Sequence, residues 1–152
     1  MSAAVRNRVE IVHGVNLGML GRRPAEHYGT ISFDQLEQRI GGFADELGLI
    51  ARFFQTDHEG NYVQHLHGLE GLADGLILNP GAWTHYSWAI RDALEICGLP
   101  AVEVHLSDVG ARDEFRRVSV ISELCIGTVS GRGADGYRAA LELLAAELGV
   151  VR

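Results

Sequence analysis

The segment 79–87, NPGAWTHYS, gathers polar side chains that could bind a ligand. It follows the apolar run 75–78 and supplies an amide from Asn79, an imidazole from His85 and several hydroxyl groups. A Pro-Gly turn needs none of these groups to redirect the chain. We therefore expect this segment to form one wall of a polar pocket as well as the start of a helix.

Similar polar groups follow the other short apolar runs of the chain; they are His13, Asn16, Asp57, His58, Glu103, His105 and Ser107. If these runs are parallel strands, their carboxyl ends meet at one edge of the sheet, where open α/β proteins bind ligands. We therefore expect these groups to share one rim. An imidazole can donate a proton near neutral pH, so this rim has residue types suited to acid–base chemistry.

The connection 17–30 is long and rich in glycine. Connections of this length in compact domains commonly have a functional role or lack fixed structure. This one contains Arg23 and Tyr28 and could close over an anionic ligand, and a solvated surface loop is the alternative. Arg112 and Arg116 follow the fourth apolar run and would add positive charge to the same rim.

Neither a metal site nor a nucleotide site is expected. The seven His residues form no HxxxH or HExxH pattern. The pattern G-x-G-x-x-G at 131–136 lies on the last expected turn, whereas a dinucleotide fingerprint belongs on the first, so we interpret it as a tight turn beside a helix. The chain contains no Lys and therefore no Walker motif.

Strand-like runs alternate with helical patterns along the whole chain. The runs cover 9–12, 49–54, 75–78, 101–105 and 125–129, and the helical patterns cover 33–47, 61–69, 87–97 and 136–148. Such alternation predicts a parallel sheet with helices on both faces. The expected fold is one α/β domain spanning 1–152: a flavodoxin-like three-layer sandwich with a five-stranded parallel sheet in the order 2-1-3-4-5. Residues 1–8 are expected to be a flexible tail.

Composition narrows the possible partners. Of the 152 residues, 47% are hydrophobic and 22% charged, which is ordinary for a soluble globular protein. The net charge of −7 argues against a nucleic-acid surface, and no apolar run is long enough to span a membrane. The N-terminus lacks a secretory signal, and Cys97 and Cys125 lie in apolar patterns, so we expect reduced core thiols and a cytoplasmic location.

Five separate segments, in order, resemble the type II 3-dehydroquinate dehydratases; they read GVNLGMLGRRPAEHYG, FFQTDHEGNYVQHLH, LILNPGAWTHYSWAIRDAL, PAVEVHLSDVGARDEFR and GRGADGYRAAL. The resemblance runs from about Val9 to Leu148. It implies a flavodoxin-like domain that assembles into trimers, usually four to a dodecamer. It also implies reversible loss of water from 3-dehydroquinate through an enolate, in the shikimate pathway, with no cofactor and no metal.

The resemblance also implies roles for individual residues. Tyr28 would remove the proton next to the ketone, with Arg23 beside it, and His105 would protonate the departing hydroxyl. A phenol has a pKa near 10, so such a base needs a nearby positive charge at neutral pH. Asn16 would bind the enolate oxygen, and Asn79, Leu106 and Ser107 would bind the carboxylate. The ring hydroxyls would be bound by His85, Arg116 and a neighbouring subunit's Asp92. Glu103 would orient His105, and Arg112 would support the loop.

The chain departs from the family pattern at several positions near these residues; they are His13, Val15, Asp57, Trp83, Tyr86, Trp88, Asp108 and Gly110. We expect His13 and Trp83 to change the volume and polarity of the pocket walls, and Asp57 and Asp108 to add negative charge. Two alternatives therefore stay open. One is a lyase or isomerase acting on another hydroxylated cyclic keto acid, and the other is a non-catalytic flavodoxin-like assembly module.

Overall fold

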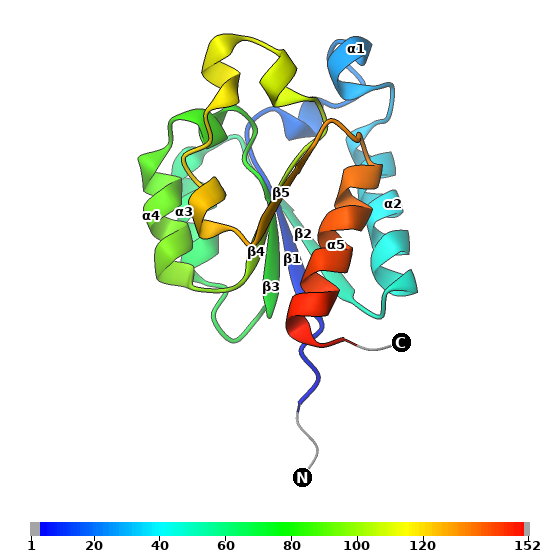
Figure 1. The fold of residues 1–152 in the computed structure, drawn as a ribbon, viewed down its shortest axis with the longest axis vertical. Helices are drawn as coiled ribbons and strands as arrows, with labels where there is room; N and C mark the ends of the chain where they lie inside the picture. Colours follow the sequence, from blue (N-terminus) through cyan, green and yellow to red (C-terminus); the bar gives the residue numbers. More distant parts are fainter. Residues whose placement is uncertain (1–3, 151–152) are drawn as a thin grey trace.

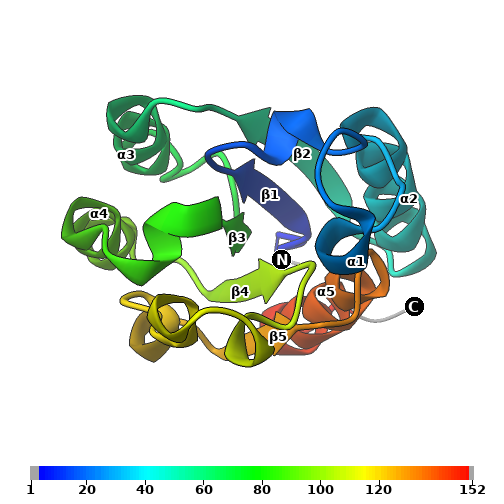
Figure 2. The ribbon, with the colours of Figure 1, turned by 90° about the horizontal axis from the view of Figure 1, so that it is seen from above.

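A computed structural model describes residues 4–150 of the chain. Among them, five parallel strands form one sheet in the order β2-β1-β3-β4-β5. The strands are β1 (Arg8–His13), β2 (Ile50–Gln55), β3 (Gly75–Asn79), β4 (Ala101–His105) and β5 (Gly127–Ser130). Helices α2 (Phe33–Glu46) and α5 (Asp135–Leu148) cover one face, and α3 (Glu59–His67) and α4 (Trp88–Cys97) cover the other (Figures 1 and 2). The expected α/β class, layers and strand order are confirmed.

Helix α2 shows how the sequence determines where a helix begins and which of its faces is buried. The Ser32 hydroxyl accepts from the backbone N–H of Gln35 at 3.2 Å, and the Gln35 side chain accepts from the Ser32 N–H at 3.0 Å. These bonds satisfy two N–H groups that a helix start leaves unpaired. Leu36, Ile40 and Ala44 then recur at helical spacing and are buried against the sheet. Burial of Leu36 and of Ile40 stabilises the fold by roughly 1.5–3 kcal/mol each.

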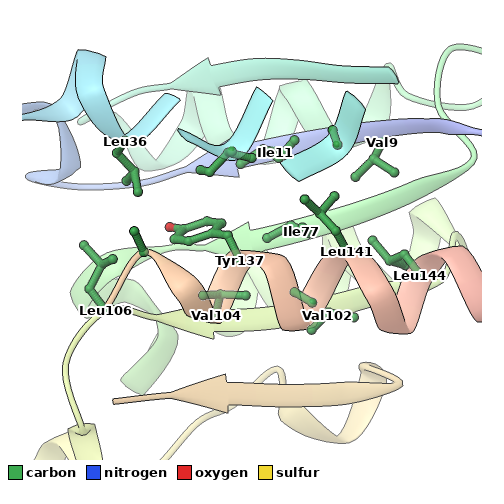
Figure 3. Packing of buried hydrophobic residues seen from close by; sticks show 14 of the residues in the cluster. Val9, Ile11, Leu36, Ile77, Val102, Val104, Leu106, Tyr137, Leu141 and Leu144 are labelled. Atoms are coloured by element: carbon green, nitrogen blue, oxygen red, sulfur yellow. The ribbon is translucent and has the colours of Figure 1, made fainter. Parts of the chain in front are cut away.

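The core lies in two layers, one on each face of the sheet. Side chains from β1, β3 and β4 meet α2 and α5 on the first face, where Ile11, Ile77, Val104 and Leu141 are fully buried (Figure 3). The second layer, between the sheet and helices α3 and α4, includes the fully buried Tyr62. Cys97 and Cys125 are free thiols packed at the margin of this second layer, half-buried where core positions were expected.

Some element ends differ from the expected ones. β5 begins at Gly127 because residues 122–124 form a 3-10 turn, and the Cys125 N–H closes it on the Ser122 carbonyl. The flexible tail was expected to include Arg8, but Arg8 belongs to β1 and forms an ion pair with Asp74. Residues 1–3 of that tail lie outside the described residues.

Short helical segments gather at the carboxyl ends of the strands, at the top of Figure 1. They are η1 (Leu17–Met19), α1 (Ala25–Tyr28), η2 (Gly81–His85), η3 (Val109–Ala111) and η4 (Glu114–Arg117). The chain approaches itself closely there, because a Cβ at Gly14 would lie 2.2 Å from the carbonyl oxygen of Pro80. Gly81 has φ +68, which a residue with a side chain rarely adopts. These two glycines let the turns after β1 and β3 lie against each other.

Candidate active site

A pocket of about 100 Å³ opens at this carboxyl edge. Ten of the twelve expected site residues line it: Asn16, Arg23, Tyr28, Asn79, His85, His105, Leu106, Ser107, Arg112 and Arg116. They come from the turns after β1, β3 and β4 and from the connection that contains α1. Of the segments expected on one rim, those after β1, β3 and β4 therefore meet at the pocket, whereas His13, Asp57 and His58 do not line it. Three of the lining residues are arginines.

Tyr28, the last residue of α1, lies between two guanidinium groups. Arg23 Nη2 donates to its hydroxyl at 2.7 Å and Arg112 Nη1 donates to it at 2.6 Å. The Arg23 guanidinium also lies 3.7 Å from the ring centroid. Two positive charges thus lie at hydrogen-bond distance from the phenol oxygen. Arg23 and Tyr28 thus bring part of the connection 17–30 to the pocket, while most of its other residues are exposed.

Arg23 keeps its charge in this setting. Burial is the main cause that lowers the pKa of Arg23, with a further decrease from the charges of Arg112 and Arg116, while Tyr28 opposes the change. A guanidinium starts so far above neutral pH that it stays protonated even so. An arginine is therefore better suited than a lysine to a position where positive charges lie close together.

His105 and Glu103 form a buried pair at the end of β4. Nε2 of His105 lies 2.5 Å from Oε2 of Glu103, and the two side chains are 7% and 1% exposed. Because Glu103 occupies Nε2, Nδ1 is the ring nitrogen left for a ligand, and it has no hydrogen-bond partner among the described residues. Burial alone would raise the pKa of Glu103, but hydrogen bonds and the His105 charge bring it below its ordinary value.

Two residues that sequence analysis missed hold this carboxylate. Thr84 Oγ1 donates to Glu103 Oε2 at 2.6 Å, and Ser119 Oγ lies 2.8 and 3.0 Å from the two carboxylate oxygens. Ser119 also accepts from the backbone N–H groups of Ile121 and Ser122. Thr84 sits inside the quoted segment 79–87, so its hydroxyl was visible as a signal, whereas nothing in the sequence marks Ser119.

Asn16 has the left-handed backbone conformation, with φ 68. Asparagine tolerates this conformation better than most residues. Its N–H donates to Asp57 Oδ1 at 2.8 Å, and Gln55 Nε2 donates to the same oxygen at 3.1 Å. Asp57 is thus a support for the first turn; it does not line the pocket.

His85 lines the pocket beside His105, with ring centroids 6.4 Å apart. Its Nδ1 lies 2.7 Å from the carbonyl oxygen of Val118, which can only accept, so Nδ1 carries the proton and Nε2 is left for a ligand. Burial is the largest cause that lowers the pKa of His85; the His105 and Arg116 charges add to it, and the Val118 hydrogen bond opposes it.

Asp92 and Glu103 are the two expected site residues that do not line the pocket. Glu103 lies behind His105, as described above. Asp92 is exposed on α4 and cannot contribute to the pocket of its own chain. Its expected place in a neighbouring subunit's pocket stays a prediction.

The expected effect of the family departures on the pocket walls was wrong for most of them. Only Val15 lines the pocket. His13 is fully buried on the other side of the β1 end, in contact with Phe33 and Tyr137. Trp83 packs edge-on against Tyr62 in the second core layer, because η2 turns its ring inward. Asp57, Tyr86, Trp88, Asp108 and Gly110 are exposed.

Among residues 4–150, no group of three or more His, Cys, Asp or Glu side chains is placed to hold a metal ion. No helix in that part of the chain is long and apolar enough to cross a membrane. In the glycine pattern at 131–136, Gly131 and Gly133 have positive φ, and Gly136 packs against Val129 and Val104. This agrees with a tight turn beside a helix.

Comparisons of the sequence and of the structure with known proteins find relatives of one family. Residues 7–145 match the family model described as dehydroquinase class II. A 3-dehydroquinate dehydratase of Thermotoga neapolitana is 51% identical over 132 residues, covering 87% of this chain and 90% of that protein. The structure of a type II dehydroquinase from Propionibacterium acnes is similar with a TM-score of 0.88 at 39% identity, covering 95% of this chain and 99% of that one. The structure of a type II dehydroquinase from Butyrivibrio crossotus has a TM-score of 0.89 at 34% identity, covering 93% of this chain and 99% of that one. Because its sequence and its fold agree with these proteins over most of its length, the chain belongs to the class II dehydroquinase family.

Proposed function

We propose that the protein is a 3-dehydroquinate dehydratase, a hydro-lyase that removes water from 3-dehydroquinate through an enolate and yields 3-dehydroshikimate. The family and its relatives support this activity. The observation that carries it is the pairing of Tyr28, held by two guanidinium groups, with His105 on the same pocket. These two residues are a base and an acid of the kinds that the elimination needs.

Tyr28 acts as the base. Its phenolate takes the proton from the carbon next to the ketone, and the electron pair moves onto the ketone oxygen as an enolate. The guanidiniums of Arg23 and Arg112 stabilise the phenolate before the transfer. Asn16 lies in the same pocket and binds the enolate oxygen, directly or through water. Preorganised donors of this kind stabilise charge that develops in the transition state.

His105 acts as the acid. As the enolate reforms its carbonyl, the bond to the hydroxyl breaks, and His105 protonates the departing oxygen from Nδ1. Glu103 contacts the other ring nitrogen, Nε2, and orients the imidazole for this transfer. Proton transfers by these two residues account for the whole reaction, so we propose no cofactor and no metal.

The other lining residues bind the substrate. Asn79, the Leu106 backbone and Ser107 take the carboxylate, and Arg112 donates to the Ser107 hydroxyl at 3.3 Å. His85 and Arg116 take ring hydroxyls. The three arginines give the pocket a positive field within a chain whose net charge is −7, which suits an anionic substrate.

We also propose a homo-oligomer built from trimers, in which Asp92 enters a neighbouring subunit's pocket. In support, Trp88, one helical turn before Asp92 on α4, is 64% exposed and Tyr86 is 59% exposed, and large exposed apolar side chains of this kind are typical of an interface. A dodecamer and a cytoplasmic, biosynthetic role in the shikimate pathway are further parts of the proposal.

The direct test is to incubate the purified protein with 3-dehydroquinate and follow the enone absorbance of the product. We expect turnover by the wild type and by His67→Leu, which alters an exposed imidazole on α3 outside the pocket. Tyr28→Phe and His105→Ala should be inactive while circular dichroism shows an intact fold. A folded wild type that leaves the substrate unchanged would reject the proposal.

A further inference from the structure

A buried chain of hydrogen bonds joins Asn79, in the pocket wall, to His13, which lies outside it. Asn79 Nδ2 is 3.0 Å from the hydroxyl of Tyr137, and that hydroxyl is 2.8 Å from His13 Nε2. Asn79 and His13 end neighbouring strands as register partners, and Tyr137 comes from α5. The Tyr137 hydroxyl points toward the carboxyl ends of the strands (Figure 3). His13 and Tyr137 are 0% exposed.

The backbone N–H of Gly81 determines which group donates in each of these hydrogen bonds. The N–H of Gly81 can only donate, and it lies 3.2 Å from Asn79 Oδ1. The amide nitrogen of Asn79 therefore faces Tyr137, whose oxygen accepts from it. The hydroxyl proton of Tyr137 is then free for His13 Nε2, which accepts it.

This assignment fixes the tautomer of His13. Because Nε2 accepts, the neutral ring carries its proton on Nδ1, and Nδ1 is a buried atom with no partner among the described residues. The opposite tautomer would leave two groups unpaired, the Tyr137 proton and Nδ1, so it is the costlier arrangement. Burial lowers the pKa of His13 to about 3, which keeps the ring neutral at physiological pH.

The His13 acceptor adds to the restraint that the Gly81 N–H places on the Asn79 amide. If the amide of Asn79 flipped, its oxygen would face Tyr137, and this oxygen could be satisfied only by the Tyr137 proton. His13 already draws that proton to the other side. In the orientation that the structure shows, one N–H of Asn79 Nδ2 is used by Tyr137 and the second is left for a ligand oxygen.

We propose that His13 is a positioning residue for ligand binding. By accepting the Tyr137 proton, it holds the Asn79 amide with its remaining N–H available to the carboxylate of the substrate. The idea rests on the proposed function, because it concerns the carboxylate end of that same pocket. It gives His13 a role although the residue touches neither the ligand nor the reacting groups.

The first test measures the tautomer and needs no activity. Nitrogen NMR of the ¹⁵N-histidine-labelled wild-type protein should show one neutral imidazole protonated on Nδ1, with Nε2 as acceptor, between pH 5 and 8. His13→Leu assigns this signal by its loss. A His13 signal protonated on Nε2, or one that titrates within that range, would overturn the inference.

The second test measures binding of quinate, a hydroxylated ring carboxylate, by calorimetry. His13→Leu, which removes the acceptor, should raise the Kd by about tenfold, and His13→Gln, which retains an acceptor, should stay within about threefold of the wild type. His67→Leu is the matched control and should leave the Kd unchanged.

Equal Kd values for His13→Leu and the wild type, or no quinate binding by the wild type, would overturn the proposal. Absence of turnover with 3-dehydroquinate would instead reject the proposed function, and it would leave both the tautomer and the quinate comparison standing. For an active enzyme, the loss in His13→Leu should appear in KM, with kcat within about threefold of the wild type, because Tyr28 and His105 keep their contacts.

Discussion

Nε2 of His105 lies 2.5 Å from a carboxylate oxygen of Glu103, and both side chains are almost completely buried. An ionised carboxylate is costly to bury unless its oxygens are hydrogen-bonded. Here Thr84 and Ser119 supply hydroxyl donors in addition to the imidazole. The pair therefore depends on two residues that never meet the substrate.

Ser119→Ala should weaken this arrangement in a measurable way. A hydrogen bond to a charged group contributes about 1.5–3 kcal/mol, so we expect kcat to fall by about tenfold or more. The pKa of Glu103, now held below its ordinary value, should rise when the donor is lost. The acid limb of the pH–rate profile should then move to higher pH.

Ser119→Thr, which keeps the hydroxyl, should retain most of the activity and the wild-type profile. Ser122→Ala removes a hydroxyl from the neighbouring turn that makes no bond to Glu103, and it should change neither quantity. A profile that stays in place for Ser119→Ala would mean that Ser119 only fills space.

The two guanidiniums at Tyr28 lead to a second prediction. Arg23→Gln and Arg112→Gln each remove a positive charge that lies within 2.7 Å of the phenol oxygen. We expect kcat/KM to fall by at least about a hundredfold in each variant, which corresponds to about 2.7 kcal/mol. The pH–rate profile should also differ from that of the wild type, because each variant removes a positive charge beside the proposed base.

Arg39→Gln is the control for this pair, since Arg39 is paired with Asp135 on the surface, outside the pocket. It should leave the pH–rate profile unchanged. Wild-type profiles for both pocket variants would show that neither guanidinium acts on the base.

Much of this site could be predicted from residue order alone. The carboxyl ends of parallel strands must lie at one edge, so polar groups after successive strands were expected to meet, and Asn16, Asn79 and His105 do. The helical pattern over 33–47 was enough to predict α2. These features depend on local chain geometry, which the sequence expresses directly.

What the sequence could not predict depends on the direction of single side chains. His13 ends β1 and Asn16 follows it three residues later, yet His13 is buried in the core and Asn16 reaches the pocket. Trp83 lies in a pocket-forming turn and turns inward. Ser119 comes from a segment with no motif and reaches Glu103 only because the fold brings the two together.

The buried, neutral His13 should make stability depend on pH. Its pKa is about 3 in the folded protein against an ordinary 6.5, so below pH 6.5 the unfolded chain binds a proton that the folded chain does not. Stability is therefore fully present above pH 6.5 and decreases as the pH falls toward 3, by up to about 1.4 kcal/mol per pH unit.

Urea unfolding at pH 7, 6, 5 and 4 measures this slope in the wild type and in His13→Leu. Other titrating groups contribute equally to both proteins, so the difference between their free energies of unfolding isolates His13. That difference should shrink as the pH falls. A difference that stays constant across the series would show that His13 takes up a proton in the folded state.

The proposed sharing of Asp92 between subunits can be tested by mixing two inactive variants. Asp92→Ala keeps Tyr28 but denies a neighbour its carboxylate, whereas Tyr28→Phe keeps Asp92 but lacks the base. If the subunits are unfolded together and refolded, a pocket that combines Tyr28 of one chain with Asp92 of the next regains both groups. In a cyclic trimer mixed at random from equal amounts, about a quarter of the pockets should do so.

Activity should therefore reappear in the co-refolded mixture and not when the separately folded variants are combined. Asp92 is exposed on α4 and does not line its own pocket, so recovery of activity requires contact between subunits. A mixture that stays inactive although size measurements show mixed oligomers would place Asp92 outside the active site.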